Sequence, residues 1–234
     1  KHVTTYARAD SIARKSVSEL RELKTAGIEH LYCGMETGSD LILRKINKGF
    51  DTATIIISGT KAKEAGMVLS EFTLFGIGGK ELAEENAVET AKVLNVIKPD
   101  FVRVHATGIK LSSEMWNYVK NKELTLQSEE EIVSEQKIML ELLADDMDCI
   151  YMNEHIVNLL LEVRGNIRTD KQNMLETINT YLQLPKQEQE LFNLGRRLNI
   201  MFFLADLNNR AKRKQTEEGL RKIKTQNPDL DLAF

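Results

Sequence analysis

The feature that most constrains the fold is a repeat of amphipathic helix, stop and apolar strand in the first half of the chain. Helix-like segments end at Gly27, Gly66 and Pro99, and an apolar run of strand type follows each stop. The stops are about 35 residues apart, the size of one βα unit. Because strands joined by helices are linked by right-handed parallel crossovers, this pattern predicts a parallel (β/α) barrel with its chemistry at the carboxyl ends of the strands.

Four strands are expected in this half, within residues 3–8, 28–39, 67–75 and 101–105. Beyond about residue 110 strands are expected to cease, and long amphipathic helices are expected near residues 128–144, 151–163, 169–183 and 186–213. The charged stretch from Arg210 onward reads as a solvated tail. The predicted class is therefore α/β, with a partial parallel (β/α) barrel over residues 1–115 and a C-terminal all-α region over residues 116–234.

Charge and cysteine content argue against several classes of function. The formal net charge of -3 gives no basic field of the kind that nucleic-acid-binding faces show, so nucleic acid is not indicated as a partner. Cys33 and Cys149 are the two cysteines, and they form no CxxC pair. Neither a disulfide framework nor a zinc site is indicated, and a reducing cytoplasm fits best.

No membrane partner is expected either. The longest apolar run, residues 198–205, is far shorter than the roughly 20 residues that a spanning helix needs. The first residues lack the apolar core of a secretory signal. Because the chain starts without Met and almost directly on a strand, we expect it to be a fragment of a longer protein.

Side chains alternate along a strand, so placing apolar residues against the helices predicts which residues face the barrel interior. The expected outward set is Leu31, Cys33, Met35, Phe72, Leu74, Val102 and Val104. The expected inward set is Thr4, Tyr6, Arg8, Tyr32, Gly34, Glu36, Glu71, Thr73, Arg103 and His105. Charges inside a barrel are costly unless paired or used, so the interior is either a set of mutually satisfied polar groups or a polar ligand cavity.

Three smaller signals leave alternatives open. The turn Gly76-Ile77-Gly78-Gly79 precedes a helix and either presents backbone N–H groups to an anion or allows close approach to a flat ligand. It is not the GxGxxG dinucleotide pattern. His105 is better suited to hydrogen bonding or proton transfer than to metal binding, because no second ligand lies at ligand spacing on its element. Cys33 is expected to be inert packing.

The order of these motifs resembles the middle of the radical S-adenosylmethionine (radical SAM) barrel, in the branch of oxygen-independent coproporphyrinogen oxidase and the Elongator-like and methylthiotransferase enzymes. The similar segments are residues 6–10, 26–28, Gly34-Met35-Glu36-Thr37-Gly38-Ser39-Asp40 with Leu43, 47–49, 65–67 and 75–79. Residues 3–115 are covered by the resemblance. The helical half carries no motif of the family.

The resemblance implies the third to sixth strands of a (β/α)6 barrel in an Fe–S oxidoreductase. In that family a CxxxCxxC loop holds a 4Fe-4S cluster that reductively cleaves S-adenosylmethionine to methionine and a 5'-deoxyadenosyl radical. This chain has no such motif, so the cluster ligands are expected upstream of it and the fragment is expected to be inactive alone. An electron donor such as flavodoxin or ferredoxin is the implied partner of the parent enzyme, and its substrate is not identified.

The resemblance also implies roles for individual residues. Glu36 matches a polar group that contacts the ribose or methionine moiety, and Lys48 matches the basic residue that pairs with the methionine carboxylate. Arg8 lines the cavity. Gly76, Ile77 and Gly78 match the backbone that flanks adenine, and Thr107 belongs to the loop that closes over the nucleoside. No metal ligand is expected within the chain.

Two other functions stay open on the sequence alone. One is a non-catalytic module whose helical half binds a protein partner on a barrel scaffold. The other is an unrelated barrel enzyme that uses Glu36, Glu71 and His105 for acid–base chemistry on a phosphorylated or sugar substrate.

Overall fold

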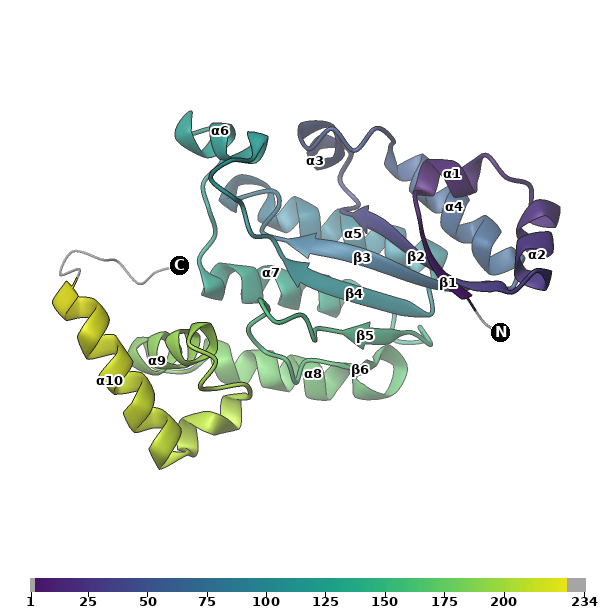
Figure 1. Ribbon diagram of the computed structural model, residues 1–234. Helices are drawn as coiled ribbons and strands as arrows, with labels where there is room; N and C mark the ends of the chain where they lie inside the picture. Colours follow the sequence, from purple (N-terminus) through teal and green to yellow (C-terminus); the bar gives the residue numbers. More distant parts are fainter. Residues whose placement is uncertain (1–2, 227–234) are drawn as a thin grey trace.

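The structure, a computed structural model, describes residues 3–226, and in this range the strands form one sheet in the order β1-β2-β3-β4-β5-β6 (Figure 1). Their bounds are β1 Val3–Ala7, β2 Ile28–Glu36, β3 Val68–Phe75, β4 Phe101–Ala106, β5 Ile150–Met152 and β6 Gly165–Asn166. Strands β1 to β5 pair in parallel, and β6 pairs antiparallel with β5. The carboxyl ends of β1 to β5 therefore meet at one edge of the sheet.

Helices connect the strands and cover one face of the sheet. Their bounds are α1 Ala9–Ala13, α2 Val17–Thr25, α3 Asp40–Lys45, α4 Thr52–Glu64, α5 Ala83–Ile97, α6 Glu114–Lys120, α7 Glu129–Leu142, α8 Ile167–Leu182, α9 Lys186–Arg197 and α10 Arg210–Gln226, with short 3-10 turns η1 Lys80–Leu82 and η2 Leu204–Asn208. In Figure 1, α4, α5 and α7 lie behind the sheet, and the face toward the viewer carries no helix across β2, β3 and β4. Among the described residues, no helix is both long and apolar enough to span a membrane.

Local sequence explains where the helices begin and end. The Asp51 carboxylate accepts a hydrogen bond from the Thr54 backbone N–H at 2.9 Å and caps α4. Ser128 and Glu131 form a capping box at the start of α7. Lys98 adopts a left-handed conformation with φ +47° directly before Pro99, so α5 ends there.

The predicted α/β class, a parallel sheet with helices on one side as in a partial (β/α) barrel, is confirmed. All four expected strands are present. On β2, Leu31, Cys33 and Met35 are buried against the helices as expected. One apolar core joins the sheet to the helices that cover it, and it includes Met139 of α7 and Ile178 of α8.

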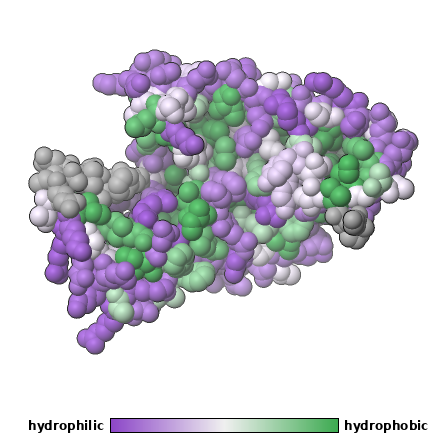
Figure 2. Space-filling view, viewed as in Figure 1, coloured by the Kyte–Doolittle hydropathy of each residue, from purple (hydrophilic) through white to green (hydrophobic). Residues whose placement is uncertain are grey.

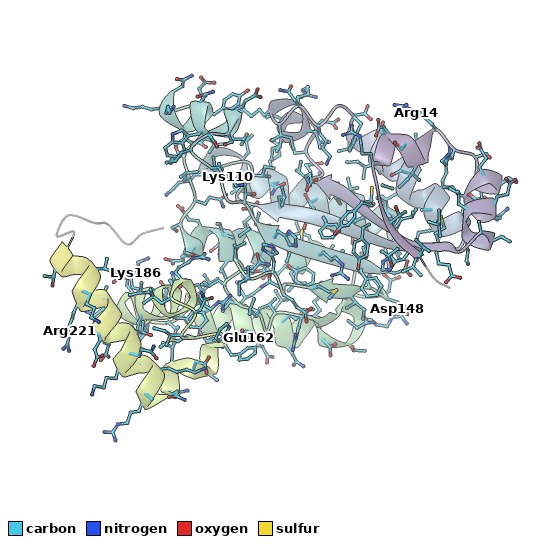
Figure 3. All side chains as sticks on the ribbon, in the orientation of Figure 1. Arg14, Lys110, Asp148, Glu162, Lys186 and Arg221 are labelled. Atoms are coloured by element: carbon cyan, nitrogen blue, oxygen red, sulfur yellow. The ribbon has the colours of Figure 1, made fainter. Side chains whose placement is uncertain are left out.

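Three expectations for the second half are wrong. The single helix expected near residues 186–213 is instead α9, the 3-10 turn η2 and the start of α10, with a break after Arg197. Strands do not cease near residue 110, because Ile150–Met152 adds a fifth parallel strand beside β4 and Gly165–Asn166 follows it. The helix expected over residues 151–163 is instead a strand end and a loop. The charged stretch from Arg210 forms helix α10, with Arg221 directed away from α9 in Figure 3. The part of this expectation that concerns residues 227–234 lies outside the described residues. The domain boundary near residue 115 stays a prediction.

The expected facing of β3 is also wrong. Glu71 and Thr73 are buried on the helix-covered face, with exposed fractions of 0% and 1%. Phe72 lies on the uncovered face, where its ring contacts those of Tyr6 and Tyr32. The apolar residues Phe72 and Leu74 of β3 therefore do not face the helices. They lie on the uncovered face, where the Phe72 ring packs against other aromatic rings.

Candidate functional site

A cavity of about 480 Å³ lies at the carboxyl ends of β1, β2 and β3, and we call it the strand-end cavity. Its lining residues are Tyr6, Ala7, Arg8, Tyr32, Gly34, Glu36, Lys48, Phe72, Leu74 and His105. The volume is in the range of pockets that hold small molecules. Most of these residues come from strand ends, so the parallel sheet itself positions the cavity.

The centre of the strand-end cavity is an ion pair between Glu36 and Lys48. Lys48 Nζ donates to Glu36 Oε1 at 2.6 Å, and the two side chains are 17% and 22% exposed for Lys48 and Glu36 respectively. Glu36 ends β2 in a left-handed conformation with φ +64°, at a register shift between Gly34 and Glu36. Such a backbone is strained for a residue other than glycine.

Gly34 makes room for this ion pair. A Cβ at position 34 would lie 2.4 Å from Glu36 Oε1 and 3.4 Å from Lys48 Nζ. The Glu36 side chain therefore folds back over the Gly34 backbone, and this conformation requires a residue without a side chain at that position.

Arg8 extends the charged side of the cavity. Its guanidinium donates to the Lys48 carbonyl at 3.1 Å and to Asp10 at 3.0 Å. The Arg8 guanidinium and the Lys48 ammonium lie 5.2 and 5.4 Å from the centre of the Phe50 ring, which places both cations within cation–π range of one aromatic side chain. Arg8, Glu36 and Lys48, three of the predicted site residues, are thus brought together.

The uncovered face of the sheet beside this ion pair is aromatic. The rings of Tyr6 and Tyr32 lie 5.3 Å apart, and those of Phe72 and His105 lie 5.4 Å apart. The Arg103 guanidinium lies 4.9 Å from the Tyr32 ring centre and donates to the Tyr32 hydroxyl at 3.2 Å. The strand-end cavity therefore joins a charged side to flat aromatic surfaces that a ring-bearing ligand can stack on.

The glycine-rich turn is occupied by the protein's own groups. The Gly76 N–H donates to Glu135 Oε2 at 2.9 Å, and Gly76 has φ +81°. Ile77 is 6% exposed, and a Cβ at Gly78 would lie 2.9 Å from Ile42 and Leu82 atoms. The buried Glu135 carboxylate of α7 thus accepts a hydrogen bond from the Gly76 N–H. The sequence had suggested that this N–H could bind an external anion.

Glu135 was not expected from the sequence. Besides Gly76, it accepts hydrogen bonds from Asn86 Nδ2 at 2.5 Å and from Gln127 Nε2 at 2.9 Å. Burial raises the pKa of the Glu135 carboxyl to about 7, and the three donors oppose that rise. One feature of the sequence could have indicated Glu135. It is an acidic residue on the apolar side of an amphipathic helix, among Ile132, Val133 and Met139.

A second cavity, of about 730 Å³, lies between the ends of β3 and β4 and helices α7, α9 and α10, and we call it the inter-helix cavity. Gly76 and Thr107 line it, whereas Ile77 and Gly78 line neither cavity. The predicted site residues therefore fall into two groups, with Arg8, Glu36 and Lys48 in one cavity and Gly76 and Thr107 in the other.

The described residues offer no metal centre. No group of three or more His, Cys, Asp or Glu residues within this part of the chain is arranged to hold a metal ion. Cys33 and Cys149 are both buried, and burial raises the pKa of both thiols. Cys33 is thus inert packing as expected. Glu71 lies on the helix-covered face, away from His105, so the acid–base set of Glu36, Glu71 and His105 is not assembled.

Comparison with known proteins adds information on the fold. No protein-family model matches the chain, and no curated protein matches it. Among the matching solved structures is the archaeal Methanocaldococcus infernus Elp3 with an N-terminus deletion (1-46), which has a TM-score of 0.51 and 17% sequence identity. The match covers 62% of this chain and 33% of that one, so the chain spans about a third of the length of that structure. Over the matched part, the chain therefore shares its fold with that structure.

Proposed function

We propose that the chain forms the later strands of a radical SAM enzyme and holds S-adenosylmethionine in its strand-end cavity. The observation that carries the proposal is the Glu36–Lys48 ion pair at the end of β2, beside Arg8, in a parallel sheet that shares its fold with Elp3. The sequence resemblance selects the same residues, and it names an Elongator-like branch of the family.

The side chains of the cavity suit the charged end of this cofactor. Lys48 carries a compact positive charge with three N–H donors, of which Glu36 takes one, so donors remain that can pair with the methionine carboxylate. Glu36 offers a second carboxylate oxygen to an ammonium group or a ribose hydroxyl. The aromatic rings of Tyr32 and Phe72, inclined to each other by 68°, line the cavity beside them. When the cofactor is bound and reduced by a cluster, it supplies a 5'-deoxyadenosyl radical to a substrate of unidentified class.

The described residues do not fit the 4Fe-4S cluster itself. A cluster needs several thiolates, whereas Cys33 and Cys149 are 0% and 1% exposed. We therefore place the cluster ligands outside this chain, and the chain alone is proposed to be inactive; an electron donor such as flavodoxin or ferredoxin is proposed as a partner of the parent enzyme. Contacts of Gly76, Ile77, Gly78 and Thr107 with the nucleoside, and a cytoplasmic location, remain predictions.

The direct test is calorimetric titration of the chain with S-adenosylmethionine. Lys48→Met should weaken binding about tenfold or more, because a charge-assisted hydrogen bond to the carboxylate is lost. Lys92→Met is the matched control, since Lys92 pairs with Glu89 on the surface and its side chain is 65% exposed. Absence of binding to the unsubstituted chain, or equal affinity of the two variants, would refute the proposed site.

A further inference from the structure

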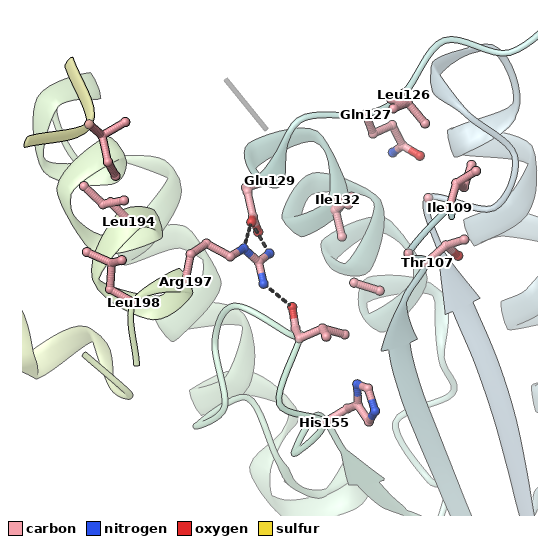
Figure 4. A pocket seen from close by; sticks show the side chains of 15 residues that line it. Thr107, Ile109, Leu126, Gln127, Glu129, Ile132, His155, Leu194, Arg197 and Leu198 are labelled. Atoms are coloured by element: carbon pink, nitrogen blue, oxygen red, sulfur yellow. Dashed lines mark hydrogen bonds and ion pairs between the residues drawn. The ribbon is translucent and has the colours of Figure 1, made fainter. Parts of the chain in front are cut away.

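The inter-helix cavity has apolar walls contributed by segments far apart in the sequence. Ile109 follows β4, Leu126 precedes α7, Ile132 belongs to α7, and Leu194 and Leu198 come from the α9 region. Figure 4 shows these side chains around the cavity, and Figure 2 shows an apolar area on this side of the molecule. At about 730 Å³ the cavity is large enough for a drug-sized ligand.

The charged residues of this cavity are already paired with each other. Arg197 Nε donates to Glu129 Oε1 at 2.6 Å, and Arg197 NH1 donates to the Val157 carbonyl at 2.9 Å (Figure 4). Glu129 is 6% exposed, so its negative charge is matched by Arg197 inside the wall. A charged ligand would find no unmatched partner in this ion pair, and the cavity therefore favours an uncharged one.

Two polar atoms of the lining are buried without a hydrogen-bond partner. They are Gln127 Oε1 and Thr107 Oγ1. Gln127 is 8% exposed, and its Nε2 donates to the Glu135 carboxylate at 2.9 Å. This bond fixes which end of the amide is the donor, so the carbonyl oxygen is the end that remains for a ligand. An unmet acceptor is costly to bury, and a ligand donor removes that cost.

We propose that the inter-helix cavity binds an uncharged, mainly apolar small molecule that donates a hydrogen bond to Gln127 Oε1. Thr107 Oγ1, which can donate or accept, provides a second polar contact. In Figure 4, Gln127 and Thr107 lie on the side opposite Leu194 and Leu198, so the polar end and the apolar body of the ligand have separate surfaces. This site does not depend on the proposed binding of S-adenosylmethionine in the other cavity.

Naphthol, its methyl ether and naphthoate form a matched set of fluorescent probes. They share one apolar body, but the first has a donor, the second has none, and the third is charged at neutral pH. Fluorescence titration of the chain should show naphthol binding about fivefold more tightly than the methyl ether, the worth of one hydrogen bond. Naphthoate should bind most weakly. Equal affinities for naphthol and the ether, or preference for naphthoate, would overturn the proposal.

Two variants locate the binding. Gln127→Met should abolish the preference for naphthol over its ether. Leu126→Trp should fill the cavity and weaken naphthol binding at least tenfold, whereas Leu142→Trp, outside the cavity, should not. Leu126 and Leu142 are 44% and 46% exposed, so the two tryptophan variants are matched in environment. Circular dichroism should show that Leu126→Trp and Leu142→Trp are both folded.

Unchanged naphthol affinity in Leu126→Trp would contradict the assigned site. Displacement of naphthol by S-adenosylmethionine would also overturn the proposal, because the cavity would then belong to the nucleoside site. If S-adenosylmethionine fails to bind at all while naphthol binds as described, the proposed function fails and this inference stands.

Discussion

His105 and His155 stack on each other, with ring centroids 4.1 Å apart and planes inclined by 27°. His105 lines the strand-end cavity and His155 lines the inter-helix cavity. The histidine pair is thus the contact between the two candidate sites. A positive charge on one ring disfavours a positive charge on the other at this separation, so the stack favours the neutral form of His105.

The first prediction concerns the titration of His105. Burial, the neighbouring His155 and the Arg103 charge lower the pKa of His105 below 6.5. Because the folded pKa is depressed, its contribution to stability is present above pH 6.5 and is lost as the pH falls through the folded value. NMR titration of the imidazole signals, assigned with His105→Gln, should give a value below 6.5 that rises in Arg103→Met. A value at or above 6.5 in the unsubstituted chain contradicts this.

The second prediction concerns Glu71, whose burial raises its carboxyl pKa well above 4.5, and neither carboxyl oxygen has a hydrogen-bond partner among the described residues. The stabilising contribution is complete below pH 4.5 and is lost as the pH rises through the folded value. Glu71→Gln should therefore flatten the dependence of Tm on pH between acid and alkaline conditions. Glu64→Gln, at an exposed position, is the control and should leave the curve unchanged. Identical curves for both variants would show that the Glu71 carboxyl titrates normally.

The third prediction concerns Gly34. A Cβ there meets the far end of the Glu36 side chain, which can move, so Gly34→Ala should cost less than about 1 kcal/mol in stability. The same movement breaks the Glu36–Lys48 bond and should weaken binding of S-adenosylmethionine severalfold. Lys92→Met is the control, because the Lys92 side chain lies on the surface and is 65% exposed. Calorimetry of both variants checks this, and unchanged affinity in Gly34→Ala would show that the ion pair is irrelevant to binding.

The fourth prediction concerns the cysteines. Both Cys33 and Cys149 should resist thiol reagents in the folded chain and react fully in denaturant, because burial both shields the thiols and raises their pKa. Anaerobic reconstitution of the chain with iron and sulfide should yield no bound iron. Fast labelling of one thiol under native conditions, or a brown protein after reconstitution, would contradict the assignment of both residues to the core.

Local sequence signals were sufficient for the first half of the fold. Strands β2 to β4 follow the stops at Gly27, Gly66 and Pro99. The family resemblance assigned Glu36 and Lys48 to one ligand, but the ion pair between them was not predicted, because Lys48 follows α3 and reaches Glu36 only in the folded chain. Strand β5 was not predictable, because three residues, Ile150–Met152, show no periodicity and gain their partner only when β4 is in place.

The facing of β3 and the inter-helix cavity depend on tertiary structure. The alternation of β3 offers two sets, Leu69 with Phe75 or Phe72 with Leu74, and hydrophobicity alone does not choose between them. The aromatic packing of Phe72 on the uncovered face decides the question. The polar network around Glu135 joins α5, α7 and two loops, so no pattern within one segment of the sequence predicts it.

The two edges of the sheet differ in whether a further parallel strand can pair with them. The reversed direction of β6 ends the run of co-directional strands on that side. Within residues 3–226, β1 has a neighbouring strand on one side only. Further parallel strands that close this sheet into a cylinder therefore have to pair with β1 first. Such closure would bury Tyr6, which is now 78% exposed.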